Sequence, residues 1–575
     1  MSEPLRSRAA LVVFLLAAAP AASQPQPEAA TGRVEKHAVV ATRHMVVAAN
    51  PLASDAGLEI LRAGGSALDA AVAVQMVLGL VEPQSSGIGG GAFLLHWSAR
   101  ERRVRSYDGR ETAPAAAAEN RFLDSSGQPL ARRPAIESGR SVGVPGAVRM
   151  LELAQRRHGR LPWKRLFEPA IRLAESGFPM SPRLNRLLEM ESALRNDPAA
   201  RTLYYDGDRA KPVGTRIVNR DYAATLRAIA RSGAGALHSG PIAQDIVQAV
   251  RSHAQPGDVT LEDLAQYRAL ERAPLCGPYR TFRICSMAPP SAGGIAVLQI
   301  LGVLERTPFA RAAPNSADAV HYFSEAGRLA YADRLRYVAD PAFVPQPVAG
   351  LLSPAYLDQR ARLVGERSMG RAQPGTPVAG WRPRGDGVET EIAGTTHFSI
   401  VDRRGDAVAM TTTIEDAFGS RIMARGFLLN NQLTDFTFAP QSEGRLVANR
   451  VEPRKRPRSS MTPVLVFDAD DSLRMVGGSP GGVAIINYVA KALVATLDWK
   501  LDVQAAASLP NFGSRNGPTE LERATLYELL GPQLRERGHE VQMLDFTSGL
   551  HLIERVKGGW RGGADPRREG VPRGD

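Results

Sequence analysis

Residues 394–402 of the chain read Gly-Thr-Thr-His-Phe-Ser-Ile-Val-Asp, and they follow a loop over 370–394 that is rich in Gly, Pro and charge. Two threonines therefore open a run of β-forming residues, which predicts a strand over 395–401. A threonine hydroxyl is a poor nucleophile unless a base lies beside it, and one such base is the free α-amine of the same residue. That amine exists only if the chain is cut directly before Thr395. The plainer interpretation is an edge strand with surface hydroxyls, so the rest of the chain must decide between the two.

The composition is that of a folded, globular protein. Of the 575 residues, 44% are hydrophobic and 23% are charged, so the chain is not of the disordered class. The length allows one large two-part domain or several ordinary ones. The net charge is +12, but the arginines are spread along the chain and aromatic residues are few. Nucleic-acid binding needs a basic face or a reader motif, so we expect no nucleic-acid partner.

The amino-terminal residues 1–23 are typical of a secretory signal. Arg6 and Arg8 precede an apolar run over 9–19, and small residues follow at 19–23 as cleavage sites. A membrane anchor is the competing interpretation, but the run is short for a bilayer and no later stretch of about 20 apolar residues appears. We therefore expect a periplasmic or secreted protein without a stable membrane anchor.

The two cysteines, Cys276 and Cys285, are spaced to face each other across a hairpin. An exported protein meets oxidants, so a structural disulfide between them is predicted. Two cysteines at this spacing with no histidine partner make a poor metal site. The ten histidines are scattered without an H-x-x-x-H pair. The sequence therefore predicts neither a metal nor a cofactor.

Hydrophobic periodicity divides the chain into a helix-rich first block (about 36–370) and a hairpin-rich part after residue 394. Helices are predicted at 54–61, 67–80, 146–156, 163–176, 221–232, 242–252, 317–336 and 483–497. Strands are predicted at 92–97, 104–107, 395–401, 407–414, 463–467, 473–476, 550–554 and about 558–563. The polar tail from Asp565 is expected to be loosely held. Elements that come in runs rather than strict alternation favour an α+β fold.

The loop over 477–482 reads Gly-Gly-Ser-Pro-Gly-Gly and matches the Gly-x-Ser-x-Gly hydrolase pattern around Ser479. That mechanism uses the backbone N–H after the serine, which Pro480 lacks, so Ser479 is rejected as a nucleophile. Gly481 and Gly482 instead stand at the start of the predicted 483–497 helix. Their N–H groups could stabilise an oxyanion, although a glycine turn that merely opens a helix is an equally good explanation of the loop alone.

Several polar residues could hold a substrate. Arg110 follows a short strand and could clamp a carboxylate. Hydroxyl donors precede a strand at Ser459 and Ser460, and an ammonium group could be received by Gln432 and Asp435. Taken singly, such residues are more often salt-bridged arginines, turns or helix caps.

These pieces together resemble the γ-glutamyltransferase (glutathione hydrolase) family of N-terminal-nucleophile hydrolases. The resemblance runs from about residue 49 to residue 567. The segments that carry it are 394–397 (Gly-Thr-Thr-His), 429–432 (Leu-Asn-Asn-Gln), 456–461 (Arg-Pro-Arg-Ser-Ser-Met), 478–482 (Gly-Ser-Pro-Gly-Gly), 86–91 (Ser-Gly-Ile-Gly-Gly-Gly) and 289–294 (Pro-Pro-Ser-Ala-Gly-Gly). The implied fold is a four-layer αββα sandwich.

The resemblance implies a role for each candidate residue. Thr395 would be the nucleophile, freed by self-cleavage after Gly394, and Thr413 would hydrogen-bond it. The residues that would hold the substrate's α-carboxylate are Arg110, Ser459 and Ser460. Those that would hold its α-ammonium are Gln432 and Asp435, and those that would form the oxyanion hole are Gly481 and Gly482. The precursor would divide into a large subunit (24–394) and a small subunit (395–575), which stay associated.

Two departures from the family pattern bear on specificity. Glu415 stands where the family commonly has an asparagine near the substrate amine, and a carboxylate there would favour a cationic amine or reshape the pocket. The segment 437–454 corresponds to the family's lid, but it is short and lacks tyrosine. A more open site would suit bulkier substrates or water as the acceptor.

Three functions therefore compete. The first is an exported γ-glutamyl hydrolase or transpeptidase that acts on glutathione-like amides and passes the acyl group to water or an amino acid. The second is an amide acylase of the cephalosporin or glutaryl type on the same fold. The third is a non-catalytic exported binding protein in which the strand at Thr395 is never cut.

Overall fold

The structure, a computed structural model, describes residues 30–381, 384–388 and 394–575. The predicted signal segment, residues 1–23, lies outside the described residues, as does part of the loop that precedes Thr395.

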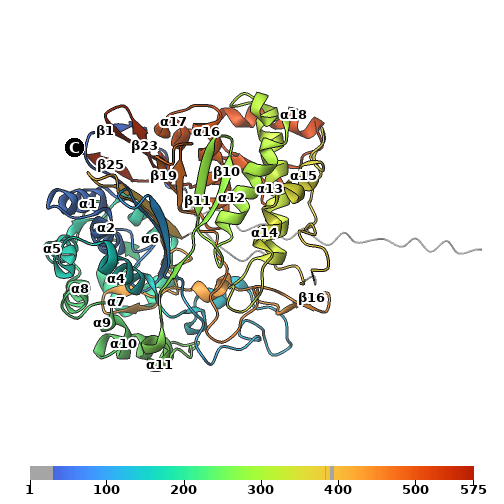
Figure 1. The fold of residues 1–575 in the computed structure, drawn as a ribbon. Helices are drawn as coiled ribbons and strands as arrows, with labels where there is room; N and C mark the ends of the chain where they lie inside the picture. The colour runs from blue at the N-terminus through green and yellow to red at the C-terminus, as the bar shows by residue number, and fades with distance from the viewer. Residues whose placement is uncertain (1–29, 382–383, 389–393) are drawn as a thin grey trace, which may run out of the picture.

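Two seven-stranded sheets form the centre of the molecule (Figure 1). The first sheet has the order β25-β2-β12-β13-β3-β4-β9, and the second has the order β1-β24-β23-β19-β18-β11-β10. The strands of the first sheet are β2 (Met45–Ala48), β3 (Gly91–Ser98), β4 (Arg103–Asp108), β9 (Leu270–Arg272), β12 (Thr395–Val401), β13 (Ala407–Thr413) and β25 (Val571–Gly574). Those of the second sheet are β1 (Val39–Ala41), β10 (Leu275–Tyr279), β11 (Phe282–Ser286), β18 (Val464–Phe467), β19 (Leu473–Gly477), β23 (His551–Val556) and β24 (Gly559–Ala564).

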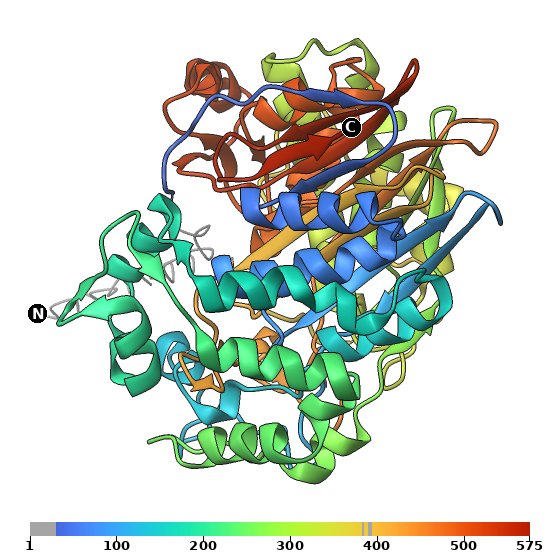
Figure 2. The same cartoon turned by 90° about the vertical axis from the view of Figure 1, so that its left-hand side faces the viewer.

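Helices cover the outer face of each sheet. Against the first sheet lie α1 (Pro51–Arg62), α2 (Ala67–Val81) and α4 (Ala147–His158), backed by α5 (Glu168–Ser176) and α8 (Arg220–Ser232). Against the second lie α12 (Gly293–Glu305) and α17 (Val503–Ser508), backed by α13 (Ala317–Tyr337) and α16 (Ile485–Leu497). The order is helix, sheet, sheet, helix, and the blue-to-green helices in front of the first sheet are seen in Figure 2. The α+β, four-layer αββα prediction is confirmed.

The remaining helices lie around this sandwich. They are α3 (Arg132–Ile136), α6 (Pro182–Met190), α7 (Pro198–Tyr204), α9 (Gly235–His238), α10 (Pro241–Arg251), α11 (Leu261–Gln266), α14 (Val348–Leu351), α15 (Pro354–Ala361) and α18 (Gly531–Glu536). The segment from 437 to 454 forms a small hairpin of β16 (Gln441–Ser442) and β17 (Arg445–Leu446).

Alternation along β12 fixes which side chains face which layer, because successive residues of a strand point to opposite faces. Phe398 and Ile400 pack in the core between the first sheet and its helices, whereas Val401 belongs to the core that includes the space between the sheets. The hydroxyl of Ser399 donates to the carbonyl of His551 on β23 of the other sheet. Odd-numbered residues of β12, Thr395 among them, therefore face the second sheet.

The helix α2 shows how local sequence builds this core. Ser66 and Asp69 form a reciprocal capping box at its start, which satisfies backbone N–H groups that a helix terminus leaves open. Every residue of Ala67–Val81 is buried. Each buried Val or Leu stabilises the fold by roughly 1.5–3 kcal/mol relative to an exposed one. The helix end nearest Glu82 lies behind the start of β12.

Two sequence-based predictions are wrong. The segment 163–176 is not one helix but a 3₁₀ turn (Trp163–Phe167) followed by α5, in which Pro169 occupies the first turn and lacks a backbone donor. The tail beyond Asp565 is not loose: its β25 pairs with β2 and completes the edge of the first sheet. The carboxylate of Asp575 contacts His44 at 2.8 Å and Arg62 at 2.9 Å. The polar composition of the tail gave no sign of these partners.

The hairpin of β10 and β11 carries both cysteines. Cys276 lies directly opposite Cys285 in the register, and the two form a disulfide. The hairpin lies at one edge of the second sheet. The bond therefore joins the two outermost strands there and lies outside the pocket described below, in keeping with the structural role predicted.

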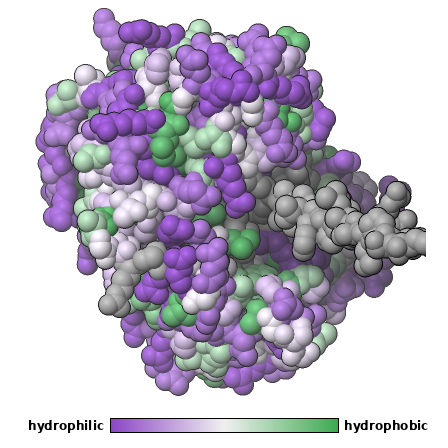
Figure 3. Space-filling model, turned by 90° about the vertical axis from the view of Figure 1, so that its right-hand side faces the viewer, coloured by the Kyte–Doolittle hydropathy of each residue, from purple (hydrophilic) through white to green (hydrophobic). Residues whose placement is uncertain are grey.

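Within the described residues, no helix combines the length and apolarity that crossing a bilayer requires. On the face shown in Figure 3, hydrophobic residues are scattered in small groups among hydrophilic ones.

Candidate active site

Thr395 is the first residue of β12, and it lies opposite Thr413, the last residue of β13. As an odd-numbered residue of β12 it faces the second sheet, whereas the hydroxyl of its neighbour Thr396 contacts Glu82 at 3.3 Å on the other face. Both threonines are buried. The strand is central in its sheet, between β2 and β13, so the interpretation of 395–401 as an edge strand with surface hydroxyls is wrong.

A chain of hydrogen bonds surrounds the Thr395 hydroxyl. It donates to the hydroxyl of Thr413 at 3.2 Å, and Thr413 in turn donates to the carbonyl oxygen of Gly394 at 3.0 Å. The backbone N–H of Glu415 donates to the same Thr413 hydroxyl at 2.8 Å. The Thr413 oxygen is thereby held between the Thr395 hydroxyl and the carbonyl of the peptide bond that precedes Thr395.

The glycine loop after β19 lies across from these hydroxyls. Gly481 and Gly482 have φ values of 135° and 55°, a region that favours glycine. A Cβ at Gly481 would fall 2.4 Å from the ring of Tyr488, so the close approach also requires glycine. The α-helix begins at Ile485, after a 3₁₀ turn over Gly482–Ala484, slightly later than predicted. The loop therefore presents its backbone near the start of α16.

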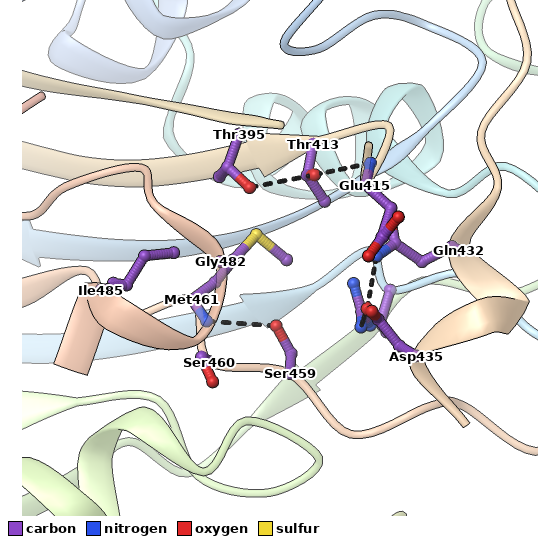
Figure 4. Close-up of a pocket in the computed structure, with 11 residues that line it drawn as sticks. Thr395, Thr413, Glu415, Gln432, Asp435, Ser459, Ser460, Met461, Gly482 and Ile485 are labelled. Carbon is purple, nitrogen blue, oxygen red and sulfur yellow. Dashed lines mark hydrogen bonds and ion pairs between the residues drawn. The ribbon is translucent and has the colours of Figure 1, made fainter. Parts of the chain in front are cut away.

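These elements line a small pocket with a cavity volume of about 10 Å³ (Figure 4). Thr395, Thr413 and Glu415 lie along one side of it, and Ser459, Ser460 and Met461 along the other. The complete lining is Arg110, Thr395, Thr413, Glu415, Gln432, Asp435, Ser459, Ser460, Met461, Gly482 and Ile485. Of the residues predicted for the site, only Gly394 and Gly481 do not line it directly. Residues far apart in the sequence, before and after Gly394, therefore meet in one place.

Arg110 and Asp435 form a buried ion pair at the end of the pocket away from Thr395. The guanidinium donates to the Asp435 carboxylate at 2.5 Å and to the carbonyl of Arg458 at 2.7 Å. The Gln432 amide also donates to Asp435, at 2.6 Å. Residues predicted to bind the two charged groups on the α-carbon of a substrate are thus joined in one network. A matched cation and anion side by side complement a zwitterion.

Glu111 follows Arg110 in sequence and packs behind it, fully buried, with 3.7 Å between its carboxyl oxygen and the guanidinium of Arg110. Burial raises the pKa of the Glu111 carboxyl to about 8, although the adjacent Arg110 opposes that rise. The protonated form therefore predominates near neutral pH, which leaves the Arg110 charge to Asp435 and to the pocket.

The two serines at 459 and 460 are held differently. The Ser460 hydroxyl accepts a hydrogen bond from Arg334 of α13 at 2.8 Å. The Ser459 hydroxyl accepts one from the backbone N–H of Met461 at 3.1 Å. Each hydroxyl therefore has a proton of its own to donate, and both line the pocket.

Glu415 has a left-handed backbone, with φ 81°, which is uncommon for a residue other than glycine. Its carboxylate contacts Arg132 of α3 at 3.3 Å and accepts a hydrogen bond from the Asn431 side chain. These contacts hold a negative group at the pocket wall beside Thr413. All residues of the short segment 437–454 are described, and none lines the pocket.

Among the described residues, one group of side chains lies close enough to hold a metal ion: His321, Glu325 and His539. Its ring nitrogens are already hydrogen-bonded, because His321 contacts His539 and the carbonyl of Gly365, and His539 contacts Thr519. The group is remote from the pocket residues in sequence and shares none of them.

Sequence reasoning missed residues that act behind the pocket lining. Arg334 is one of many arginines in a helical pattern, and nothing in its neighbourhood signals contact with Ser460. Glu111 is next to Arg110 in the sequence, and that position is a signal that could have identified it as part of the site. Arg568 donates to the carbonyl oxygen of Thr395 at 3.3 Å, from a tail that the sequence predicted to be loose.

Comparison with known proteins agrees with this geometry. The sequence model of the family described as gamma-glutamyltranspeptidase matches residues 53–574. The glutathione hydrolase proenzyme of Escherichia coli (strain K12) is 37% identical over 512 residues, which cover 87% of this chain and 86% of that protein. The acylase ACY 1 proenzyme of Pseudomonas sp. (strain SE83) is 34% identical over 558 residues, with 95% and 96% covered.

Solved structures give the same answer. A cephalosporin acylase from Bacillus halodurans matches with a TM-score of 0.81 and 27% identity, over 98% of this chain and 99% of that one. A family match over nearly the whole chain, relatives above 30% identity, and a shared fold all agree. The chain belongs to the γ-glutamyltranspeptidase family.

Proposed function

We propose that the chain is a self-processing γ-glutamyl hydrolase or transpeptidase that works through an acyl-enzyme on Thr395. One observation carries the proposal: the Thr395 hydroxyl and the Arg110–Asp435 ion pair line the same pocket. A γ-glutamyl group carries an α-carboxylate and an α-ammonium several bonds from its reactive carbonyl. The pocket offers a complement to each charge at one end and a nucleophile at the other.

Self-cleavage is the first step of this proposal. The Thr395 oxygen attacks the Gly394 carbonyl carbon, and the C–N bond breaks as an ester forms. Water then hydrolyses the ester, which leaves a carboxylate on Gly394 and a free amine on Thr395. Thr413 supports the step because it contacts both the attacking hydroxyl and the attacked carbonyl. Its proton can stabilise the negative charge that develops on the carbonyl oxygen.

Cleavage would yield a large subunit (24–394) and a small subunit (395–575) that remain together. The first sheet takes β2, β3, β4 and β9 from one side of the cleavage point and β12, β13 and β25 from the other. The second sheet is mixed in the same way. Separating the subunits would break backbone pairings in both sheets and expose the core between them.

Catalysis would then use the new amine as the base. A free α-amine has a pKa of roughly 8, so a useful fraction is unprotonated near neutral pH and can take the hydroxyl proton. The hydroxyl oxygen attacks the γ-carbonyl, the amine returns the proton to the leaving group, and an acyl-enzyme forms. Water or the amine of an amino acid resolves it. Threonine's branched Cβ restricts χ1 and helps to hold the oxygen in line.

The residues of the pocket walls would bind the substrate and stabilise the negative charge that develops on its carbonyl oxygen. Arg110 with the Ser459 and Ser460 hydroxyls would receive the substrate carboxylate, and Gln432 with Asp435 would receive the ammonium. The N–H groups of Gly481 and Gly482 would receive the oxyanion. Removing one such donor typically lowers kcat by about 10²–10³-fold.

An amide acylase on the same fold is the second candidate. It is favoured by a pocket lining without any residue of the segment 437–454, by Glu415 at the pocket wall, and by the acylase names of relatives that cover almost the whole chain. Release of a γ-glutamyl anilide compared with a glutaryl anilide, which lacks the α-amine, separates the two. Preference for the amine-free compound would remove the proposed roles of Gln432 and Asp435.

The third candidate, a non-catalytic binding protein, is set aside by membership of an enzyme family. Export to a periplasm or the medium is also proposed, on the signal-like residues 1–23 and the Cys276–Cys285 disulfide. Fractionation of cells that express the full chain, with detection of the mature protein outside the cytoplasm, tests it.

Variants at the nucleophile test the proposed function directly. Thr395→Ala should remain uncut and should not release p-nitroaniline from γ-glutamyl-p-nitroanilide. Thr395→Ser, which keeps a hydroxyl and can form an α-amine, should be cut and retain part of the activity. Equal turnover by wild type and Thr395→Ala would refute the proposal.

A further inference from the structure

Arg568 reaches the nucleophile residue from the far end of the chain. It lies between β24 and β25, it is 3% exposed, and its guanidinium donates to the carbonyl oxygen of Thr395 at 3.3 Å. Two other nitrogens of the same group donate to the carbonyl of Thr547, at 3.2 and 3.1 Å. The guanidinium therefore bridges the first residue of β12 to the loop that precedes β23.

The surroundings are shaped to admit this side chain. A Cβ on Gly549 would lie 2.7 Å from Cδ of Arg568 and 2.6 Å from the ring of Pro480. The backbone N–H of Gly549 donates to the hydroxyl of Ser479 at 3.1 Å. Gly549 thus packs between Arg568 and the glycine loop that faces Thr395, and a larger residue there would press on both the Arg568 side chain and the ring of Pro480.

The charges around this end of β12 come from several elements. Glu82 faces the opposite side of the strand, where Thr396 contacts it, and Glu415 lies at the pocket wall beyond Thr413. His397 and His551 are buried nearby, and burial lowers the pKa of each imidazole well below its usual range, so both are neutral. Among these neighbours, Arg568 is the cation that contacts the main chain of Thr395 itself.

We propose that Arg568 is a positioning residue for the catalytic threonine, which fixes the Thr395 main chain and favours the uncharged form of its freed amine. This inference rests on the proposed function, because the amine exists only after cleavage before Thr395. A fixed carbonyl limits rotation of the residue whose amine and hydroxyl must face each other. A nearby positive charge disfavours a second positive charge, so the amine stays available as a base at lower pH.

The sign of the effect can be checked by removing the charge. Without Arg568 the ammonium form is less disfavoured, so the pKa of the amine rises and less of it is unprotonated at a given pH. The rise of kcat/KM on the acidic side of its pH profile, called the acidic limb below, should therefore move to higher pH, by roughly one unit for a partly screened cation. Loss of a merely structural contact would lower activity at every pH without moving that limb.

The experiment compares pH profiles of kcat/KM for γ-glutamyl-p-nitroanilide from pH 5 to 10. Arg568→Gln should show the upward shift together with a lower kcat. Arg568→Lys keeps the charge but loses the paired contacts, so its limb should stay near the wild-type position while kcat falls several-fold. Arg360→Gln is the matched control, since Arg360 is also buried and donates to two main-chain carbonyls, of Leu329 and Gln373. Its limb should not move.

An acidic limb that stays at the wild-type position in Arg568→Gln would overturn the inference, whatever happens to kcat. If that variant remains uncut, the profile is measured on Gly549→Ala, whose Cβ would fall 2.7 Å from Cδ of Arg568, and an unmoved limb there also overturns the inference. Failure of the proposed function is distinguishable, because it appears as cleavage or turnover in Thr395→Ala. Failure of this inference leaves Thr395→Ala inactive and only the Arg568 profiles unchanged.

Discussion

The hydroxyl of Thr413 donates to the carbonyl oxygen of Gly394 at 3.0 Å while it accepts from the hydroxyl of Thr395 at 3.2 Å. One side chain therefore contacts both the attacking group and the carbonyl that it would attack. The register of β12 and β13 produces this arrangement, since it pairs Thr395 with Thr413 directly. A slip of one residue would turn either hydroxyl to the opposite face of the sheet.

Thr413→Ala should slow self-cleavage. The variant loses the hydroxyl that contacts the Gly394 carbonyl, and we expect the rate of cleavage to fall by about 10–10²-fold. Thr413→Ser, which keeps the hydroxyl, should be cut at a rate close to that of wild type. A time course of freshly made precursor on denaturing gels measures both. Rapid cleavage of Thr413→Ala would show that the hydroxyl has no part in the step.

Gly481→Ala should damage catalysis and local packing together. The added Cβ would fall 2.4 Å from the Tyr488 ring, and the backbone φ of 135° is strained for alanine. We expect kcat to fall by about 10²–10³-fold, the effect of a displaced oxyanion donor, with a smaller change in KM. Gly444→Ala is the control, because it also has positive φ, 71°, but nothing lies within 4 Å of its Cβ. If both variants keep wild-type kcat, the glycine loop does not form the oxyanion hole.

Glu415→Gln should weaken binding of substrates that carry an ammonium group. The carboxylate contacts Arg132 and Asn431 at the pocket wall, and the amide keeps its shape without its charge. The loss is roughly 1 kcal/mol, which is about fivefold in KM for a γ-glutamyl anilide. The KM for a glutaryl anilide, which has no ammonium, should change less. Equal effects on the two compounds would mean that Glu415 does not interact with the substrate ammonium group.

Acid should destabilise the fold through buried neutral histidines. Burial lowers the pKa of His551 to about 3 from an ordinary value of 6.5, so the folded state keeps this imidazole uncharged while the unfolded state protonates it below 6.5. The contribution to stability is complete above pH 6.5 and is lost as the pH falls toward the folded pKa. The slope is about 1.4 kcal/mol per pH unit for one such group.

Urea unfolding between pH 8 and pH 5 measures this slope. His551→Gln cannot be protonated and should flatten this slope relative to wild type; the slope, not the stability at pH 8, is the quantity compared, because the smaller side chain also changes the packing. An unchanged slope in His551→Gln would show that this imidazole does not titrate on unfolding in that range.

The sequence predicted the strands around the nucleophile well, because their cues are local. The strand at 395–401 alternates between two faces and is bounded by glycine and a turn, and it matches β12 residue for residue. Four of the six segments that carry the family resemblance contribute residues to the pocket lining, and the segment 289–294 contacts that lining through the backbone N–H of Ala292, which donates to the carbonyl of Ser459. The helix α12 (Gly293–Glu305) was missed: almost all its residues are buried, so the sequence shows no amphipathic period, and it lacks the side-chain cap that marks the start of the equally buried α2.

Contacts between distant segments could not be predicted from local pattern. Arg568 lies in a tail of Gly, Pro and charged residues, a composition typical of loose termini, yet it contacts a residue 173 positions away. The pairing of β25 with β2 joins the two ends of the described chain, and no periodicity signals it. Likewise, Arg110 and Asp435 were assigned to different substrate groups, and only the fold reveals that they bond to each other.

The measurement that tests the account most directly is the intact mass of the purified, active protein, with amino-terminal sequencing of each polypeptide. We predict two polypeptides that co-purify, the smaller one beginning at Thr395 and extending to Asp575, and a single uncut polypeptide for Thr395→Ala. Active wild-type protein that consists of one unbroken chain, with no amino terminus at Thr395, would contradict the central claim.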